Sequence, residues 1–340
     1  MKAMHSRGAV ARLMAHVIPV VVLAGALPLS QPARASSPRT HAQAKIIIGF
    51  IVKTLTNPYF VAMQPVAQAE ANKLGVKLVY EAGNYDGDNN TQTSEIDNLI
   101  TQGAKAIVLI PNLSSGIVPA VRRATAHHIA VLALDTATDP ASAVTSFIAT
   151  DNYKAGLLNG MWAHKAMGST KPVIALLEGT PGSSVNTDRM GGFLNGYGMN
   201  TKKYVVGDQI TNGDQAKAQT AMENILTAHP NINLVWTINE PAALGAATAI
   251  KSHGMAGKIR IVSMDGGCRG IKAVQAGTIN TDVMQFPRKM AQLGVDYGYQ
   301  AAQGKKIPVK IDTGEILVTK QSMAGVPNKT ISFGLANCWG

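Results

Sequence analysis

The stretch IIIGFIVKTLTNPYF, residues 46–60, decides the fold of this chain. Its apolar half, Ile46 to Val52, is typical of a strand that is buried on both faces, and Asn57-Pro58 can begin a helix directly afterwards. Four more apolar runs that end on a polar residue follow at 130–134, 234–238, 259–264 and 281–284. Strands that alternate with helices in this way predict an α/β fold built on parallel sheets.

Polar side chains stand at the ends of these five strands. They are Asn57, Asp135, Asn239, Glu240, Asp265 and Gln285, and the rings of Tyr59 and Phe60 accompany the first of them. In an open α/β sheet, the carboxyl ends of the parallel strands form the crevice that binds ligands. Amide and carboxylate groups hydrogen-bond sugar hydroxyls, and aromatic rings pack against the C–H face of a sugar. The sequence therefore predicts a sugar-binding crevice.

The alternation of strands and helices starts at Lys45 and restarts near Asp151. The first helix is expected to run from an Asn57 cap to Gly75, with its apolar residues on one face. Two successive units of the same βαβα pattern predict two similar lobes, each a doubly wound parallel sheet. The restart at Asp151 marks the first crossing of the chain between the lobes.

The first 35 residues differ from the rest of the chain. Three basic residues precede the apolar run 17–29, and residues 33–35, Ala-Arg-Ala, form a small-x-small cleavage site. This pattern predicts a secretory signal peptide over 1–35, a disordered lead-in over 36–44 and a mature protein in the bacterial periplasm. A membrane anchor is the alternative, but the run is short for a span and contains two prolines. Cleavage after Ala44 stays open as a second site.

Charge argues against one class of partner. The 340-residue chain carries 31 Lys and Arg against 20 Asp and Glu, a formal net charge of +11. Loss of residues 1–35 removes four basic residues and no acid, which lowers the net charge to +7. The Lys and Arg residues form no continuous run in the sequence, and an exported protein meets little nucleic acid. We therefore expect no nucleic-acid partner.

The cysteines and histidines show no metal-binding or catalytic spacing. Five of the eight histidines lie near predicted helix ends, and the other three precede the first strand. Cys268 and Cys338 both fall in the mature part, where an oxidising compartment favours one disulfide; two unpaired buried thiols are the alternative. The sequence contains no Gly-rich phosphate loop after the first strand and no nucleophile elbow. We therefore expect no cofactor, no metal and no enzymatic activity.

Six segments carry a resemblance to a known family. They are residues 53–63 (KTLTNPYFVAM), 86–88 (DGD), 149–152 (ATDN), 237–243 (TINEPAA), 262–268 (VSMDGGC) and 338–340 (CWG). The chain resembles the periplasmic sugar-binding proteins of ABC importers, ribose/galactose type, which have the type I periplasmic binding protein fold. The match to the fructose-binding members is closer still, because the last three segments are typical of that group and not of the whole superfamily.

The resemblance implies two lobes joined by three crossings of the chain. The first lobe would comprise residues 45–150 and 286–312, and the second lobe residues 151–285 and 313–340. The lobes of such proteins close on the sugar by a hinge motion about the crossings, and the closed form is presented to a membrane permease. We expect a monomer whose partners are a monosaccharide and the permease of an ABC importer; a chemoreceptor as a further partner is compatible with transport.

Carried over residue by residue, the resemblance implies sugar contacts from both lobes. They are Asn57, Tyr59, Phe60, Asp88, Asp135, Thr136, Arg189, Asn212, Asn239, Glu240, Asp265 and Gln285. Some have a structural alternative: Phe60 fits the apolar helix face, Arg189 fits a surface ion pair, and Asp88 fits a solvated turn. Thr136 stands where ribose-type members place an Arg, so a bidentate donor is lost, and Asn212 falls where those members have an aromatic wall. These departures argue against ribose, and the closer resemblance to the fructose-binding members predicts fructose or a related ketose.

Two other classes of function have features in common with this chain. The effector domain of a transcriptional regulator needs a helix-turn-helix at the N-terminus, where this chain has the predicted signal peptide. An exported sugar-active enzyme needs paired acid and base carboxylates, which Asp135 and Asp265 could mimic. The sequence favours a periplasmic receptor that captures a monosaccharide and delivers it unchanged.

Overall fold

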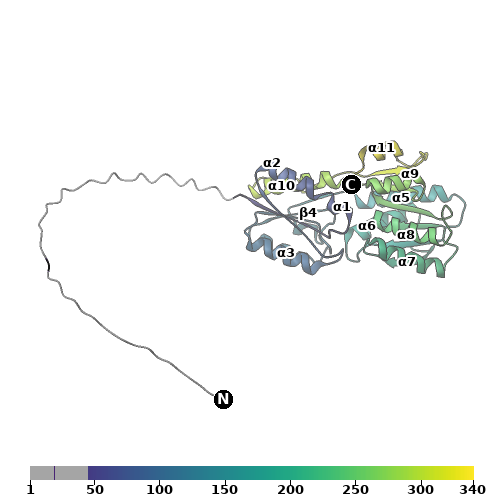
Figure 1. The fold of residues 1–340 in the computed structure, drawn as a ribbon, viewed down its shortest axis with the longest axis horizontal. Helices are drawn as coiled ribbons and strands as arrows, with labels where there is room; N and C mark the ends of the chain where they lie inside the picture. Colours follow the sequence, from purple (N-terminus) through teal and green to yellow (C-terminus); the bar gives the residue numbers. More distant parts are fainter. Residues whose placement is uncertain (1–18, 20–44) are drawn as a thin grey trace, which may run out of the picture. The chain divides into compact units, whose positions relative to one another are not determined.

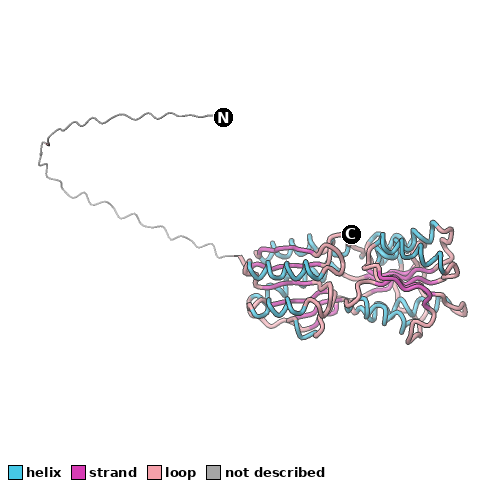
Figure 2. Tube along the Cα trace, turned by 90° about the horizontal axis from the view of Figure 1, so that it is seen from below, coloured by secondary structure: helices cyan, strands magenta, loops and turns pink. Residues whose placement is uncertain are grey.

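The structure, a computed structural model, describes residue 19 and residues 45–340. The predicted signal peptide and lead-in lie outside the described residues, apart from Pro19. Within the described ranges, no helix is both long and apolar enough to span a membrane. Two six-stranded sheets, each with helices on both faces, make up residues 45–340 (Figures 1 and 2). This arrangement confirms the predicted α/β fold with two similar lobes.

The first lobe is built on the sheet β11-β5-β4-β3-β1-β2, in which all neighbours are parallel. Its strands are β1 (Ile47–Val52), β2 (Lys77–Ala82), β3 (Ala106–Leu109), β4 (Ala130–Leu134), β5 (Ser146–Ala149) and β11 (Lys310–Asp312). Its helices are α1 (Pro58–Val61), α2 (Gln64–Leu74), α3 (Asn89–Thr101), α4 (Val118–Ala126) and α10 (Pro287–Ala302), with a short 3-10 helix, η1 (Ala141–Ala143). Helices α2 and α10 lie together on one side of this sheet, and α3 lies on the other side (Figure 1).

The second lobe is built on the sheet β12-β10-β9-β8-β6-β7. Its strands are β6 (Ile174–Glu178), β7 (Val205–Ile210), β8 (Leu234–Thr237), β9 (Arg260–Asp265), β10 (Thr281–Met284) and β12 (Ile316–Thr319). Its helices are α5 (Asn152–Met167), α6 (Ser184–Gly196), α7 (Gln215–Ala228), α8 (Glu240–Ser252), α9 (Cys268–Ala276) and α11 (Ile331–Asn337). All neighbouring strands are parallel except β12, which is antiparallel to β10.

The antiparallel strand follows from the way the chain crosses between the lobes. Strand β11 ends at Asp312 in the first sheet, and β12 begins at Ile316 in the second, so the chain keeps its direction through a short link. The parallel strands of the second sheet run toward the first lobe, whereas β12 enters from that lobe and runs away from it. The other two crossings lie between β5 and α5 and between β10 and α10.

The helix predicted from Asn57 to Gly75 is in fact two helices, α1 and α2. Its ends are as predicted: the Asn57 side chain caps the start by accepting from the Tyr59 N–H, and Gly75 ends it at φ +70°. The interruption precedes Pro65, which has no N–H to donate to the carbonyl of Val61 and whose ring crowds that carbonyl. The single helix was therefore a wrong prediction that this proline could have corrected.

The disulfide between Cys268 and Cys338 is present, as predicted. It holds the C-terminal residues at the start of α9, where the Cys268 N–H donates to the Trp339 carbonyl at 2.9 Å. The Trp339 ring packs edge-on against Tyr59 of the first lobe, with ring centroids 5.5 Å apart. Its Nε1 donates to the Asp265 carbonyl at 3.0 Å. The end of the chain therefore ties β9 of the second lobe to α1 of the first.

Helices α5 and α6 pack with their backbones in contact because each presents glycine to the other. A Cβ on Gly156 of α5 would overlap the Arg189 carbonyl, and a Cβ on Gly192 of α6 would overlap the Tyr153 carbonyl. This close approach places the Arg189 side chain beside the start of α5, where its Nε donates to Asn152 Oδ1 at 2.7 Å. The glycines thus set the position of a buried arginine.

We expect Gly192→Ala to lower the free energy of unfolding by about 1–3 kcal/mol, the usual cost of overpacking. The neighbouring Gly191→Ala is the matched control on the same helix, because its Cβ would lie 3.7 Å from the nearest atom, on the Tyr153 ring. That change should raise the free energy of unfolding by about 0.5–1 kcal/mol through helix propensity. Urea unfolding of both variants measures this; equal effects would contradict the backbone contact.

Candidate functional site

The carboxyl ends of the two sheets face one another across two adjoining cavities. The inner cavity has a volume of about 30 Å³ and the outer one of about 310 Å³. Asn57, Asp86 and Gly213 line both, so the two cavities belong to one cleft. Residues that follow β1, β2 and β4 line the inner cavity from the first lobe. Residues that follow β6, β7 and β8, with Asp265 at the end of β9, line it from the second lobe. The crevice predicted at the strand ends is therefore present.

Arg189 lines the inner cavity and links the two lobes. Its guanidinium lies 3.8 Å from an oxygen of Asp135 in the first lobe and 3.8 Å from an oxygen of Asp265 in the second. It also donates to the Asn152 side chain at 2.7 Å and to the Ile238 carbonyl at 2.9 Å. At 3.8 Å the carboxylates attract the guanidinium without hydrogen-bonding to it. All three side chains are at most 5% exposed, so the attraction acts away from bulk water.

Asp135 and Asp265 each keep one oxygen free. Oδ1 of Asp135 and Oδ2 of Asp265 are buried and have no hydrogen-bond partner among the described residues. Both residues have positive φ, +58° and +133°, a conformation that is costly outside glycine and that clusters at functional sites. Burial raises the pKa of Asp265 to about 7; Arg189 opposes this rise, while the carboxylates of Glu240 and Asp135 add to it. Buried oxygens are normally paired, so these two are candidates for contact with a ligand.

Tyr59 and Phe60 contribute the aromatic wall of the inner cavity and also belong to the first-lobe core. Each ring is 3% exposed, and the two pack edge-on with centroids 5.4 Å apart. The Tyr59 hydroxyl lies 3.5 Å from Gln285 Oε1 and 3.3 Å from the sulfur of Met290. Burial, with Asp135 and Asp265 nearby, raises the pKa of Tyr59 well above its usual value. Both alternatives, core and cavity wall, therefore apply to these rings.

Two asparagines line the cleft while capping helices. Asn57 Oδ1 accepts from the Tyr59 N–H at 3.0 Å at the start of α1. Asn239 Oδ1 accepts from the Ala242 N–H at 3.0 Å at the start of α8, and its amide donates to the Gly213 carbonyl at 3.2 Å. Each cap leaves further hydrogen-bonding capacity on the amide group, which has two donors and two lone pairs on its oxygen. A cap and a ligand contact are compatible in one residue.

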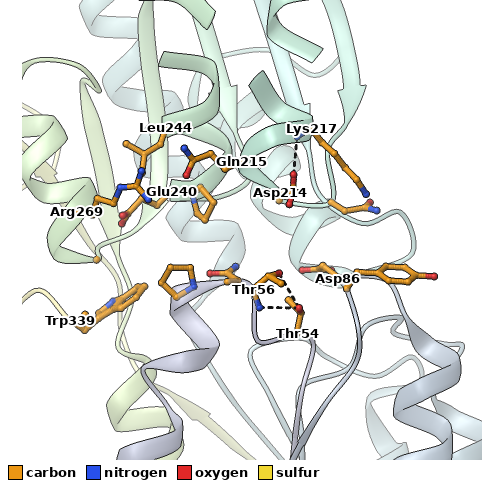
Figure 3. A pocket seen from close by; sticks show the side chains of 18 of the residues that line it. Thr54, Thr56, Asp86, Asp214, Gln215, Lys217, Glu240, Leu244, Arg269 and Trp339 are labelled. Carbon is orange, nitrogen blue, oxygen red and sulfur yellow. Dashed lines mark hydrogen bonds between the residues drawn. The ribbon is translucent and has the colours of Figure 1, made fainter. Parts of the chain in front are cut away.

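The outer cavity lies between the loops after β1 and β2 and the start of α7, α8 and α9 (Figure 3). In that view Thr54, Thr56 and Asp86 lie on the side of the first lobe, and Asp214, Lys217, Glu240, Leu244 and Arg269 lie on the opposite side. Two residues predicted as sugar contacts, Asn212 and Glu240, line this outer cavity and not the inner one.

Three predicted contacts line neither cavity: Asp88, Thr136 and Gln285. Asp88 caps α3; its burial alone raises its pKa, but hydrogen bonds from Thr91 and Asn84 outweigh this and hold the pKa at about 2. The Thr136 hydroxyl lies 3.4 Å from Asp135 Oδ2. Gln285 is fully buried and donates to Asp265 Oδ1 at 2.9 Å, so it supports that residue from behind.

The structure brings further polar residues to the cleft that sequence reasoning missed. Lys53 lies 3.8 Å from Asp86 in its own lobe and 3.4 Å from the Ser183 hydroxyl of the second lobe. Thr180 donates to Asp86 Oδ1 at 2.6 Å across the cleft. Thr180 and Ser183 lie in the turn between β6 and α6. Their place after the end of a parallel strand is the same signal that identified the other residues, and it could have found them.

A second pair of bonds joins the lobes at the same loop. The Ser184 N–H donates to Ser114 Oγ at 3.0 Å, and the Ala137 N–H donates to Ser184 Oγ at 2.9 Å. The Ser114 N–H donates to the Gly182 carbonyl at 3.0 Å. We call the contacts of loop 179–184 with the first lobe the latch. It explains why the inner cavity is small, since the latch holds the lobes together beside it.

The inner cavity combines a guanidinium, carboxylates, amides and two aromatic rings from both lobes. Such a set donates to and accepts from hydroxyl groups and offers a π-face to C–H groups. Within residues 45–340, no group of three or more His, Cys, Asp or Glu side chains is arranged to hold a metal ion. The chemistry of the cleft therefore suits an uncharged polyhydroxy molecule.

The family model of the periplasmic binding protein domain matches residues 48–306 of this chain. The chain belongs to the periplasmic binding protein family. The ribose import binding protein of Escherichia coli K12 is 32% identical to this family member over 295 residues, which covers 86% of this chain and 97% of the relative. The D-allose-binding periplasmic protein of the same organism is 28% identical over 277 residues, 79% of this chain and 89% of that one. The resemblance to ribose/galactose-type sugar-binding proteins is thereby confirmed.

Solved structures of ABC transporter solute-binding proteins have the same fold as this periplasmic binding protein. One from Agrobacterium vitis, with bound D-fucose, has a TM-score of 0.77 and 29% identity over 82% of this chain and 97% of its own. One from Actinobacillus succinogenes 130z, with bound D-allose, has a TM-score of 0.73 and 28% identity over 81% of this chain and 98% of its own. The type I periplasmic binding protein fold is thereby confirmed for this family member.

We expect Arg189→Met to lower the free energy of unfolding by about 3–5 kcal/mol at neutral pH, because it leaves two buried carboxylates facing each other. The loss should shrink at acidic pH, where protonation removes their repulsion. Arg123→Met is the matched control: Arg123 pairs with Asp97 at 2.9 Å, but both side chains are about half exposed, so the change should cost at most about 1 kcal/mol. Denaturant unfolding at two pH values tests this, and equal losses for both arginines would refute the central role of Arg189.

Proposed function

We propose that this periplasmic binding protein captures a monosaccharide between its lobes and delivers it to the permease of an ABC importer. The observation that carries the proposal is the cluster at the inner cavity. Arg189 bridges Asp135 and Asp265 from opposite lobes, and each carboxylate keeps a buried oxygen free for a hydroxyl hydrogen. A ligand that satisfies both oxygens would bind both lobes at once.

Capture requires the lobes to open. The inner cavity measures about 30 Å³, whereas ligand pockets usually measure at least about 300 Å³. We propose that the first lobe, residues 45–150 and 286–312, moves against the second, residues 151–285 and 313–340, about the three crossings. The latch bonds near Ser184 break in this motion. Each is an ordinary hydrogen bond of about 0.5–1.5 kcal/mol net, so a bound sugar can shift the balance toward closure.

The sugar proposed is D-fructose or a related ketose. The support is the departure of this chain from the ribose-type pattern: Thr136 in place of an Arg, and Asn212 in place of an aromatic wall. The names and bound ligands of the relatives instead include ribose, D-allose and D-fucose. D-ribose is therefore the direct competitor for the site.

We propose a receptor in preference to the sugar-active enzyme for a geometric reason. An acid and base pair needs two carboxylates with open space between them for the reacting bond. Here Arg189 lies between Asp135 and Asp265 and is attracted to both. We further propose a monomer without a cofactor that acts in the periplasm, with a chemoreceptor as a compatible second partner.

We expect Asp135→Ala and Asp265→Ala each to weaken sugar binding by about 10-fold to 100-fold, because each removes the free oxygen that accepts from a sugar hydroxyl and a hydrogen bond to a charged group contributes about 1.5–3 kcal/mol. Isothermal calorimetry with D-fructose and D-ribose measures this, and circular dichroism checks the fold. Asp97→Ala, on the surface, is the control with unchanged affinity. Normal affinity in both cleft variants would remove the proposed site.

We also expect D-fructose to raise the melting temperature of the wild-type protein more than D-ribose does at equal concentration. The reason is linkage: the tighter ligand stabilises the folded state more. A thermal-shift screen over pentoses, hexoses, ketoses and polyols measures the order. A larger shift with D-ribose would defeat the ketose assignment while leaving the receptor proposal intact.

A further inference from the structure

A second pair of carboxyl groups lies in the second lobe: Glu240 lines the outer cavity, and Asp282 lines neither cavity. Glu240 is the first residue of α8, and Asp282 lies in the middle of β10. Asp282 is fully buried and Glu240 is 7% exposed. A Cβ on Gly270 would lie 2.4 Å from Glu240 Oε2 and 2.3 Å from Asp282 Oδ2, so these two oxygens are at most about 4.7 Å apart.

Neither carboxyl group has a cation at salt-bridge distance among the described residues. Glu240 Oε2 and both oxygens of Asp282 also have no hydrogen-bond partner there. The charged groups around the pair are Arg189 on α6, Asp265 at the end of β9 and Arg269 on α9. Asp214 and Lys217, at the start of α7, line the outer cavity with Glu240.

The loop after Asp265 faces this pair with its backbone. The N–H of Gly266 lowers the pKa of Asp282, and the N–H groups of Gly267 and Gly270 lower the pKa of Glu240, but each by less than burial raises it. Burial raises the pKa of Glu240 to about 7 and that of Asp282 well above its usual value. Both carboxyl groups therefore resist ionisation together.

Two ionised carboxylates at this separation would repel each other in a buried space, whereas one proton between them replaces the repulsion with a hydrogen bond. We propose that Glu240 and Asp282 share one proton and that the pair, through the amides of residues 266–270, positions Asp265 at the cleft. The positioning part rests on the proposed function. Loss of the proton would push the carboxyl groups apart, move the glycine loop and turn Asp265 away from the ligand.

The pair predicts the sign of a pH dependence. The folded protein holds the proton up to a pH near or above 7, while an unfolded glutamate releases it near 4.5. Between pH 4.5 and about 7 the folded state binds more protons than the unfolded state, so the free energy of unfolding falls as the pH rises. Asp282→Asn replaces the protonated carboxyl with an amide that can donate to Glu240 at any pH.

The test compares wild type, Asp282→Asn and the control Glu223→Gln, a half-buried glutamate on α7. We expect the melting temperature of wild type and control to fall in parallel between pH 5 and pH 8, and that of Asp282→Asn to fall less. At pH 7 the intensity of the infrared band of protonated carboxyl groups should correspond to one group fewer in Asp282→Asn than in wild type. Parallel melting curves with an unchanged band would overturn the shared proton.

Sugar affinity tests the positioning. Calorimetry uses D-fructose and D-ribose between pH 6 and pH 9. Asp265 titrates in this range in both proteins, so the two pH slopes are compared. As the pH rises, wild-type affinity should weaken relative to that of Asp282→Asn, by up to tenfold per pH unit for one linked proton. Equal pH slopes in both proteins would overturn the positioning role. Absence of binding of every sugar would refute the proposed function, and the infrared and melting measurements, which need no ligand, would still decide the proton pair.

Discussion

The attraction between the Arg189 guanidinium and two carboxylates from opposite lobes governs the cleft. A buried cation needs more than one partner, because its transfer out of water costs more free energy than one ion pair recovers. Asp135 and Asp265 supply that pairing only when the lobes approach, since one carboxylate comes from each. This cluster contains two carboxylates and one guanidinium, and the raised pKa of Asp265 reduces the net negative charge that results. The buried carboxylate oxygens that lack a hydrogen-bond donor can accept from the hydroxyl groups of a ligand.

Backbone packing keeps this charge cluster in place. Glycines on α5 and α6 let the two helices touch, which fixes Arg189 beside Asn152. On the other side of the cluster, Gln285 and the indole of Trp339 hold Asp265 through its side chain and its carbonyl. These supports come from elements that are distant in sequence and rigid by themselves. The geometry of the site therefore depends on helix and strand packing more than on the loops that line it.

The two lobes are joined by polar contacts of modest strength beside the charge cluster. The latch bonds involve hydroxyls, backbone N–H groups, the Lys53 ammonium and the Asp86 carboxylate. Residues 179–184 make them with residues that follow four strands of the first lobe. The bonds of Thr180 to the Asp86 carboxylate and of the Lys53 ammonium to Ser183 involve a charged group. The others are neutral hydrogen bonds, which exchange readily with water because their net contribution is small. A cleft closed by such bonds can open and close without unfolding either sheet, which agrees with a separate apolar core in each lobe.

Much of the fold and part of the site were predictable from the sequence. Apolar runs buried on both faces identified the strands, Asn57 and Gly75 identified helix ends, and two cysteines allowed only one disulfide pair. Strand ends located Asp135, Asn239 and Asp265, because the carboxyl edge of a parallel sheet is a property of chain direction. What the tertiary structure alone decided is which side chains meet across the lobes. Asp86 faces the cleft while Asp88 caps a helix, Gln285 supports Asp265 from behind, and Thr180 reaches the first lobe. These contacts join residues far apart in the chain, and their distances depend on how two packed bodies approach, which no local pattern encodes.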